Sequence, residues 1–181
     1  MKFTNSLIKG KLLKRYKRFF ADIKVNNKII TAHCPNTGSM QGLLDEGNEV
    51  LVTEHNDPKR KLKFTLEIIK AKKRYVGVNT HRANKIVNHG LENKLISEFK
   101  TIKNIKPEFK FSDDTRFDFL CDSNLIEVKN VTLFRENDIA EFPDAVTSRG
   151  TKHLNMLIKS IKKGYKPVSY THLTLPTRAV V

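Results

Sequence analysis

Two short stretches of the chain bring two carboxylates and an ammonium group to positions where they could act together. Residues 116–120 read Arg-Phe-Asp-Phe-Leu and residues 125–129 read Leu-Ile-Glu-Val-Lys, with turn-forming residues between them. If both stretches are strands of one hairpin, Glu127 and Lys129 lie two residues apart and project from the same face. Asp118 lies on that face too if the hairpin register allows it. Two carboxylates beside a lysine suit a divalent metal ion and a lysine that positions or activates water.

An Asp followed by Glu-x-Lys on the next strand is the minimal signature of PD-(D/E)xK nucleases. In this interpretation Asp118 and Glu127 are ligands of Mg²⁺ or Mn²⁺, and Lys129 is the catalytic residue beside the attacking water. The pattern is short, however, and lysine is abundant in this chain. Ion pairing between the two strands explains the same residues equally well. The spacing alone therefore leaves a metal site and a structural ion pair both open.

A second group of polar residues gathers just before the last predicted helix, which we expect from about Lys152 to Ile161. Asp144, Arg149 and His153 are secondary site candidates, because Arg149 and His153 could flank a phosphate at the helix N-terminus. A structural role is equally open, with Thr151 as the N-cap. The histidines show no HExxH or similar spacing, which argues against a zinc hydrolase.

Cationic residues in the first half of the chain are interleaved with aromatic residues. Cations that contact phosphates and aromatic rings on which bases stack are the two elements of a nucleic-acid-binding groove. Phe19 is the aromatic residue that we expect to belong to the core instead. The nucleic-acid-binding candidates are Lys14, Arg15, Lys17, Arg18, Lys59, Arg60 and Lys61.

The elements that must position these residues fall into two kinds. Up to residue 79 the signals are those of short strands separated by turn formers, typical of a small barrel, with an OB-fold as the obvious candidate. The five predicted strands cover residues 19–25, 29–34, 49–53, 64–69 and 75–78. After Thr80, which can cap a helix ending near Gly90, helical periodicity continues over residues 91–99.

The fold class that this pattern predicts is a two-domain α+β or α/β protein. We expect an OB-like β-barrel, residues 1–80, followed by a mixed sheet with helices like that of PD-(D/E)xK nucleases, residues 81–166. The second sheet would contain the strands 116–121 and 125–131, which form the hairpin described above.

The charge of the chain points to a polyanionic partner. Lys and Arg outnumber Asp and Glu by 34 to 19, which gives a formal net charge of +15. Such an excess suits nucleic-acid phosphates, although a lysine-rich surface can also be merely solvated. The two cysteines form no CxxC pair, and no apolar run is long enough for a signal peptide or a membrane span. We therefore expect a cytoplasmic protein that does not interact with membranes.

Six motifs in order resemble those of the sugar fermentation stimulation (SfsA) family. No single one is specific, but together they span residues 15 to about 166. They are the segments 33–40 (with Pro-Asn-Thr-Gly), 56–61, 76–84, 116–119, 127–133 and 142–154.

The resemblance implies an N-terminal OB-like domain, a nuclease-like second domain and DNA binding without sequence preference. It also implies a regulatory role in sugar fermentation, particularly maltose metabolism, and it places Asp118, Glu127 and Lys129 at the nuclease-like positions. Three hypotheses follow from it: a DNA-binding module, a Mg²⁺- or Mn²⁺-dependent nuclease, and an RNA-binding protein.

The resemblance ends near Lys166. Residues 167–181 do not align with the family, and residues 169–177 resemble translated adapter sequence at the end of a gene fragment. We therefore expect this tail to be foreign and the second domain to be incomplete. In that case the helix at residues 154–161 should carry an unusually exposed apolar patch. The alternative is a divergent natural C-terminus.

Overall fold

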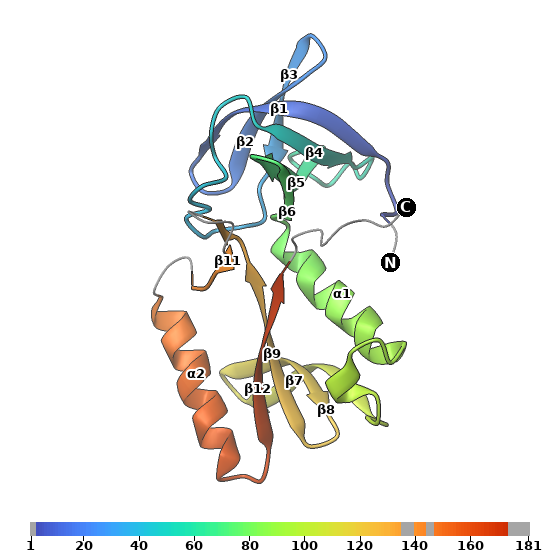
Figure 1. Cartoon of the computed structure of the whole chain (residues 1–181), viewed down its shortest axis with the longest axis vertical. Helices are drawn as coiled ribbons and strands as arrows, with labels where there is room; N and C mark the ends of the chain where they lie inside the picture. Colours follow the sequence, from blue (N-terminus) through green and yellow to red (C-terminus); the bar gives the residue numbers. More distant parts are fainter. Residues whose placement is uncertain (1–2, 135–139, 144–146, 174–181) are drawn as a thin grey trace. The chain divides into compact units, whose positions relative to one another are not determined.

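The computed structural model describes residues 3–134, 140–143 and 147–173, and the chain divides into two compact units (Figure 1). The first comprises Met1–His81, Asn130–Ala145 and Leu173–Val181, and the second Arg82–Lys129 and Val146–His172. The segment Asn130–Ala145 thus joins the first unit, although it lies within the range 81–166 assigned above to the second domain. None of the helices in the described ranges is long and apolar enough to cross a membrane.

The first unit is built on a closed five-stranded barrel, as the sequence predicts for an OB-fold. The strands follow one another in the sheet as β3-β2-β1-β4-β5-β6. A parallel pairing of β3 with β5, through Ala32↔Phe64 and His33↔Thr65, closes the barrel. The strands of the closed barrel are β1 (Leu7–Tyr16), β2 (Phe20–Val25), β3 (Lys28–His33), β4 (Glu49–Glu54) and β5 (Phe64–Ala71). A sixth strand, β6 (Arg74–Gly77), pairs with β5 in addition.

Alternating residues of these strands fill the barrel. Leu12, Ile23, Val50 and Leu66 are fully buried in one cluster. The backbone of β1 approaches β2 closely at Gly10, where an added Cβ would lie 2.6 Å from the Ile23 Cγ2 atom. Glycine is required there because the space is already occupied.

Strand β1 was missed by the sequence analysis, and Phe19 was misplaced. Lys9, Gly10, Lys11 and Leu12 do alternate in the manner of a half-buried strand, but the lysines on the outer face obscure the apolar signal. Phe19 lies in the turn between β1 and β2 and is exposed, so its assignment to the core was wrong.

The Arg15 side chain holds the loop that follows β3. Its Nη2 atom donates to the backbone carbonyls of Asn36 (2.7 Å), Gly38 (3.0 Å) and Arg18 (3.0 Å). The buried Asn36 completes the arrangement, because its Oδ1 accepts from the Gly38 N–H and its Nδ2 donates to Thr132 Oγ1. The Pro-Asn-Thr-Gly motif is therefore a loop that polar contacts fix in place.

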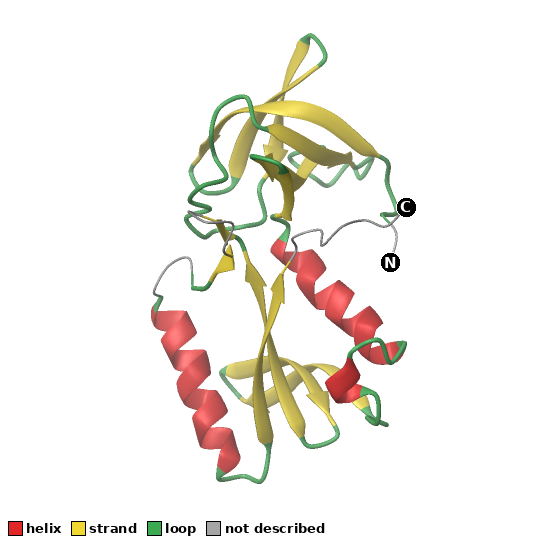
Figure 2. Cartoon of the chain, viewed as in Figure 1, coloured by secondary structure: helices red, strands yellow, loops and turns green. Residues whose placement is uncertain are grey.

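The second unit has a four-stranded sheet in the order β12-β9-β8-β7, with helices in addition (Figure 2). Ala83 and Val87 of α1 pack with Ile126 of β9, whereas Leu157 of α2 packs with Leu125. Since Leu125 and Ile126 are consecutive in a strand, the two helices cover opposite faces. The elements are α1 (Thr80–Glu92), a 3₁₀ turn (Ser97–Phe99), β7 (Ile105–Ser112), β8 (Thr115–Cys121), β9 (Asn124–Val131), α2 (Ser148–Ile161) and β12 (Lys166–Leu173). The first unit also has the short strands β10 (Leu133–Phe134) and β11 (Ala140–Glu141).

Two details of the second unit correct the sequence analysis. Helix α2 begins at Ser148 with Thr147 as its N-cap, earlier than expected, so Thr151 is not the cap. The predicted helical stretch 91–99 is mostly not helix: α1 ends at Glu92, and only the short 3₁₀ turn follows.

The apolar patch expected on α2 is confirmed. Leu154, Ile158 and Ile161 are each more than half exposed, although Leu157 on the same helix is buried. Within the tail, residues up to Leu173 form β12, and Val168 and Tyr170 are partly buried against the core. The foreign origin of residues 167–181 stays a prediction, and residues 174–181 lie outside the described part of the chain.

Replacing Arg15 with alanine should destabilise the protein, because three backbone carbonyls lose a charged donor. We expect the free energy of unfolding to fall by about 1–3 kcal/mol, measured by urea unfolding followed by circular dichroism. The neighbouring exposed Lys17 serves as the control, and Lys17→Ala should unfold like the wild type. Equal stability of the two variants would show that the guanidinium does not hold the loop.

Candidate functional site

Strands β8 and β9 position the three residues of the Asp, Glu-x-Lys pattern. The two strands form the predicted hairpin, with the pairs Cys121↔Asn124, Leu120↔Leu125 and Phe119↔Ile126. Asp118 precedes Phe119 on β8 and Glu127 follows Ile126 on β9, so both lie just beyond the last of these pairs. Beyond these pairs the Val128 N–H of β9 donates to the Asp118 side chain, while β8 remains paired with β7.

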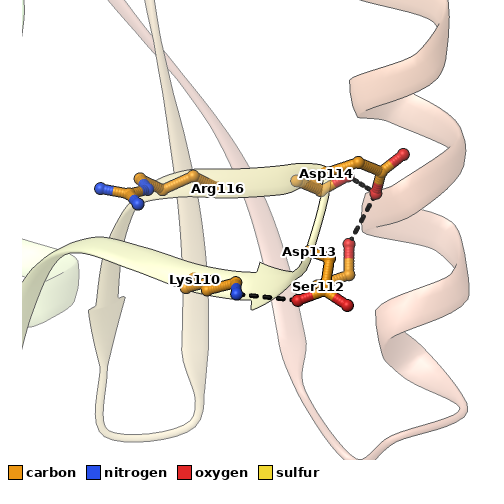
Figure 3. Close-up of a pocket in the computed structure, with 6 residues that line it drawn as sticks. Lys110, Ser112, Asp113, Asp114 and Arg116 are labelled. Atoms are coloured by element: carbon orange, nitrogen blue, oxygen red, sulfur yellow. Dashed lines mark hydrogen bonds and ion pairs between the residues drawn. The ribbon is translucent and has the colours of Figure 1, made fainter.

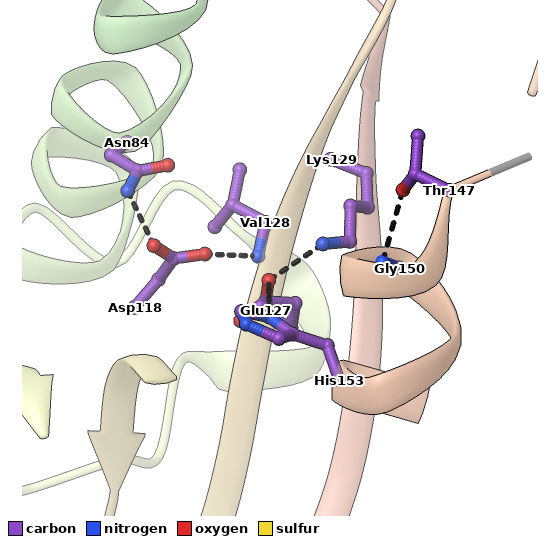
Figure 4. A network of polar contacts seen from close by, with 8 residues as sticks. All are labelled: Asn84, Asp118, Glu127, Val128, Lys129, Thr147, Gly150 and His153. Atoms are coloured by element: carbon purple, nitrogen blue, oxygen red, sulfur yellow. Dashed lines mark hydrogen bonds and ion pairs between the residues drawn. The ribbon is translucent and has the colours of Figure 1, made fainter. Parts of the chain in front are cut away.

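The carboxylate of Glu127 is the centre of the site (Figure 4). Its side chain is only 7% exposed, and its Oε1 atom lies 2.6 Å from Lys129 Nζ. The same oxygen lies 2.7 Å from Nδ1 of His153, which comes from α2. Because a carboxylate can only accept, the imidazole presents its N–H at Nδ1 and, when neutral, leaves Nε2 as an acceptor. Three predicted residues, Glu127, Lys129 and His153, are thus in direct contact.

Asp118 is held by other partners. Its Oδ2 accepts from the Val128 backbone N–H (2.7 Å), and its Oδ1 accepts from Asn84 Nδ2 (2.6 Å) on α1. Burial and then the negative charge of Glu127 raise the pKa of Asp118 above its usual range. The folded-state pKa therefore exceeds the unfolded one, so the stability contributed by this group falls as the pH rises between the two values.

The two carboxylates are therefore coupled by charge but bound separately, Asp118 toward α1 and Glu127 toward α2 (Figure 4). That both share one cation stays a prediction. The sequence analysis gave no role to Asn84, although it lies in one of the family-like motifs. A single asparagine near the start of a helix does not indicate a functional site in the sequence. Asn84 reaches Asp118 only through the tertiary fold.

The N-terminal turn of α2 brings His153 to Glu127. Thr147 caps the helix, since its Oγ1 accepts from the Gly150 N–H at 3.0 Å. His153 follows in the second turn and reaches the carboxylate with its side chain mostly buried, 15% exposed. The other two secondary candidates, Asp144 and the side chain of Arg149, lie outside what the structure describes.

The donor set fits a hard divalent cation bound partly by water. Within the described ranges, no three His, Cys, Asp or Glu side chains are grouped so that they alone could hold a metal ion. Mg²⁺ does not need such a cage, because it takes one or two carboxylates and completes its shell with water and substrate phosphates. Glu127, which is buried, and Asp118, which is partly buried, are the two carboxylates here that could supply such ligands.

The candidate nucleic-acid-binding cations divide into two groups. Arg15 and Arg60 donate within the first unit, Arg60 to Thr65 Oγ1 at 2.8 Å, so both have structural partners. The remaining candidates are exposed to solvent. They are Lys14, Lys17, Arg18, Lys59 and Lys61.

A small surface pocket of about 230 Å³ lies at the turn between β7 and β8 (Figure 3). It contains no residue of the Glu127 site. Asp114, one of its lining residues, lies 2.7 Å from Lys152 on α2. The hydrogen bond from Lys152 is the main cause that lowers the pKa of Asp114 to about 2. This ion pair links the turn to the first part of α2.

An OB barrel followed by a second sheet with helices on both faces defines a two-domain class of protein. The family models identify which one. The model described as "SfsA N-terminal OB domain" matches residues 13–78, and "Sugar fermentation stimulation protein RE domain" matches residues 81–178. The second match continues past Lys166, so the expectation that the resemblance ends there was wrong. The chain belongs to the sugar fermentation stimulation (SfsA) family, as its motifs predict.

Individual relatives agree with this assignment. The "Sugar fermentation stimulation protein homolog" of Pelagibacter ubique (strain HTCC1062) is 65% identical over 170 residues, covering 92% of this chain and 73% of the relative. The homolog of Marinomonas sp. (strain MWYL1) is 40% identical over 177 residues, covering 94% and 69%. A solved structure of SfsA from Pyrococcus furiosus, in complex with Ca²⁺, has a TM-score of 0.84 at 24% identity, covers 97% of this chain and 76% of that one, and confirms the fold.

Replacing Glu127 with glutamine should lower the pKa of Asp118, because the second cause of its upward shift is the Glu127 charge. Burial remains in the variant, so the pKa should stay above the ordinary aspartate value. Carboxyl ¹³C NMR titration in the presence of a chelator measures both. The Asp114 signal in the same spectra is the internal control and should keep its pKa of about 2. An unchanged Asp118 pKa would contradict the coupling of the two carboxylates.

Proposed function

We propose that this chain binds DNA without sequence preference, chiefly through the backbone phosphates. The observation that carries the proposal is the set of exposed cations on the OB unit, within a chain of net charge +15. Neutralising phosphates and releasing their counterions supplies most of the affinity of non-specific binding. Regulation of sugar fermentation, which the family's name indicates, would then act through DNA, and so would the role in maltose metabolism that the resemblance implies.

The position of these cations supports contact with phosphates. Lys59 and Lys61 stand on the loop between β4 and β5, and Lys17 and Arg18 on the turn between β1 and β2. Side chains on such loops reach a polyanion without displacing the barrel core. No helix in the described ranges follows a recognised pattern for reading the major groove, so base-specific readout has no support from the sequence.

Binding affinity should fall steeply with salt and differ little between duplexes of unrelated sequence. In the double variant Lys59→Ala/Lys61→Ala, the slope of log affinity against log salt should decrease by up to about 2, one unit for each lost phosphate contact. Fluorescence anisotropy with labelled duplexes measures it, in the presence of a chelator. The matched control is Lys159→Ala/Lys162→Ala, which removes the same charge from exposed positions at the end of α2. An equal loss of slope in both variants would mean that the OB cations have no special role.

A second candidate function is divalent-metal-dependent cleavage of nucleic acid. The specific observation in its favour is that Lys129 and His153 meet on one oxygen of Glu127, with Asp118 electrostatically coupled to them. The Ca²⁺ complex of the Pyrococcus furiosus relative supports a divalent cation in this family. Asp118 and Glu127 would hold Mg²⁺ or Mn²⁺, which would stabilise charge on the phosphate and activate water.

The protein's own groups have distinct tasks in such a reaction. Lys129 provides a positive charge beside the attacking water and stabilises the negative charge that develops on the phosphate. Glu127 fixes the His153 ring through Nδ1, so Nε2 can take a proton from water. Asn84 and the Val128 N–H orient Asp118.

Binding RNA instead of DNA would use the same exposed cations.

Incubation of DNA and RNA substrates with Mg²⁺ or Mn²⁺ separates these functions. For a nuclease, we expect the wild type to cleave the substrates and to stop cleaving when a chelator is added. The cleavage rate should fall about 100-fold or more in Lys129→Ala and in Glu127→Gln. Lys110→Ala, which removes an exposed lysine from β7, is the control and should cleave like the wild type. Cleavage that persists in Glu127→Gln would assign the activity to a contaminant, and binding without cleavage would leave DNA binding as the function.

A further inference from the structure

A row of side chains crosses the outer face of the OB barrel. The strand registers place Tyr16 of β1 opposite Phe20 of β2, and Phe20 opposite His33 of β3. Ala21 and Ala32, the adjacent residues on β2 and β3, are fully buried in the barrel core. Because successive residues of a strand point to opposite faces, Phe20 and His33 point outward. Directly opposite residues share a face, so Tyr16 belongs to the same row.

The two aromatic rings of this row are stacked and held in place. The ring centroids of Tyr16 and Phe20 are 5.4 Å apart with an interplanar angle of 17°. The Tyr16 hydroxyl donates to Asp22 Oδ1 at 3.3 Å, and Thr31 Oγ1 donates to the same oxygen at 2.8 Å. The two rings thus stack on one another, and the hydrogen bond to Asp22 fixes the orientation of the Tyr16 ring before any ligand arrives.

Two cations lie near this row, Lys14 and Arg60. Lys14 Nζ lies 5.5 Å from the Tyr16 ring centroid and 3.7 Å from Asp22 Oδ2. The lysine therefore offsets the negative charge of Asp22, which lies beside the aromatic rings. The Lys14 side chain remains 68% exposed and can still reach a ligand. On the other side, Arg60 donates to Thr65, which is the register partner of His33.

The electrostatic environment of His33 also indicates positive groups nearby. Burial, followed by the charges of Arg60 and His81, lowers the pKa of His33. The lowered pKa favours an uncharged imidazole at His33, whose strand position is beside Phe20, and Arg60 supplies a positive charge that attracts phosphates. Aromatic faces flanked by cations are what a single strand needs: rings for its bases and charges for its backbone.

We propose that this row, Tyr16, Phe20 and His33 flanked by Lys14 and Arg60, binds single-stranded nucleic acid by stacking unpaired bases on its rings. The inference rests on the proposed nucleic-acid binding and adds the form of the ligand. In a duplex the bases are already stacked on one another and cannot reach the rings, whereas the phosphates remain accessible to the cations. Stacking is sequence-tolerant, since every base has a π face, and so agrees with binding without sequence preference.

The test compares the full chain's affinity for single and double strands. The probes are labelled oligothymidylate and oligouridylate of about 20 nucleotides, longer than the site of one OB-fold, and a DNA duplex of the same length. Anisotropy titrations contain a chelator, so that cleavage cannot interfere. The variants Tyr16→Leu and Phe20→Leu remove a ring but keep an apolar side chain, and Tyr16→Phe keeps the ring. Thermal unfolding of each variant establishes that it is folded.

Tyr75 of β6 provides the matched control. It also lies under a lysine, with Lys70 Nζ 5.1 Å from its centroid, and its hydroxyl also donates to an acid, Glu49, at 2.9 Å. Since it pairs near the opposite end of β5 from Thr65, it is not part of the row. Tyr75→Leu therefore removes an equivalent ring from another place on the same barrel.

We expect each of Tyr16→Leu and Phe20→Leu to weaken single-strand binding about ten-fold, with duplex binding unchanged. Tyr16→Phe and Tyr75→Leu should bind single strands like the wild type. Whichever of oligothymidylate and oligouridylate binds with the higher affinity indicates whether the site prefers DNA or RNA. If the wild type binds duplex but the ring variants lose no single-strand affinity, or if Tyr75→Leu loses as much, this inference is overturned while the proposed function stands. If the wild type binds neither form, the proposed function itself fails.

Discussion

The buried carboxylate of Glu127 is the group on which the organisation of the second unit depends. A charged group taken out of water is strongly destabilising unless partners replace the lost hydration. Glu127 obtains them from Lys129 on its own strand and from His153 on α2. Strand β9 and the first turns of α2 must therefore keep one relative position, which the Thr147 cap and the Lys152–Asp114 pair also support.

The contacts of Glu127 and Asp118 bear on the two interpretations that the sequence left open, a metal site and an ion pair between the strands. The ion pair exists, but it joins Glu127 and Lys129 within one strand, and Asp118 has different partners altogether. A lysine and a histidine that hold a carboxylate are also the groups that could position water beside it. Structural and chemical roles thus coincide in the same contacts, and the presence of one is no argument against the other.

The sequence predicted those parts of the fold that depend on local periodicity. Strands β8 and β9 alternate cleanly, and their two-residue spacing placed Glu127 and Lys129 on one face. Strand β1 was missed because its exposed positions are lysines, and Thr147 was missed because several residues nearby can cap a helix. The contact of His153 with Glu127 joins residues 26 apart in sequence, so only tertiary packing could reveal it.

Charged side chains have different surroundings in the two units. On the OB unit, Lys17, Lys59 and Lys61 stay exposed, where each acts through its charge and does not require a fixed geometry. Around Glu127 the charges are buried and neutralise one another, so their effect depends on distances of less than 3 Å. Attraction of a polyanion by many exposed charges tolerates the loss of one of them, whereas the proposed chemistry at Glu127 would not. Under the proposed functions, binding of nucleic acid should therefore persist when the Glu127 site is altered, because different residues would carry the two functions.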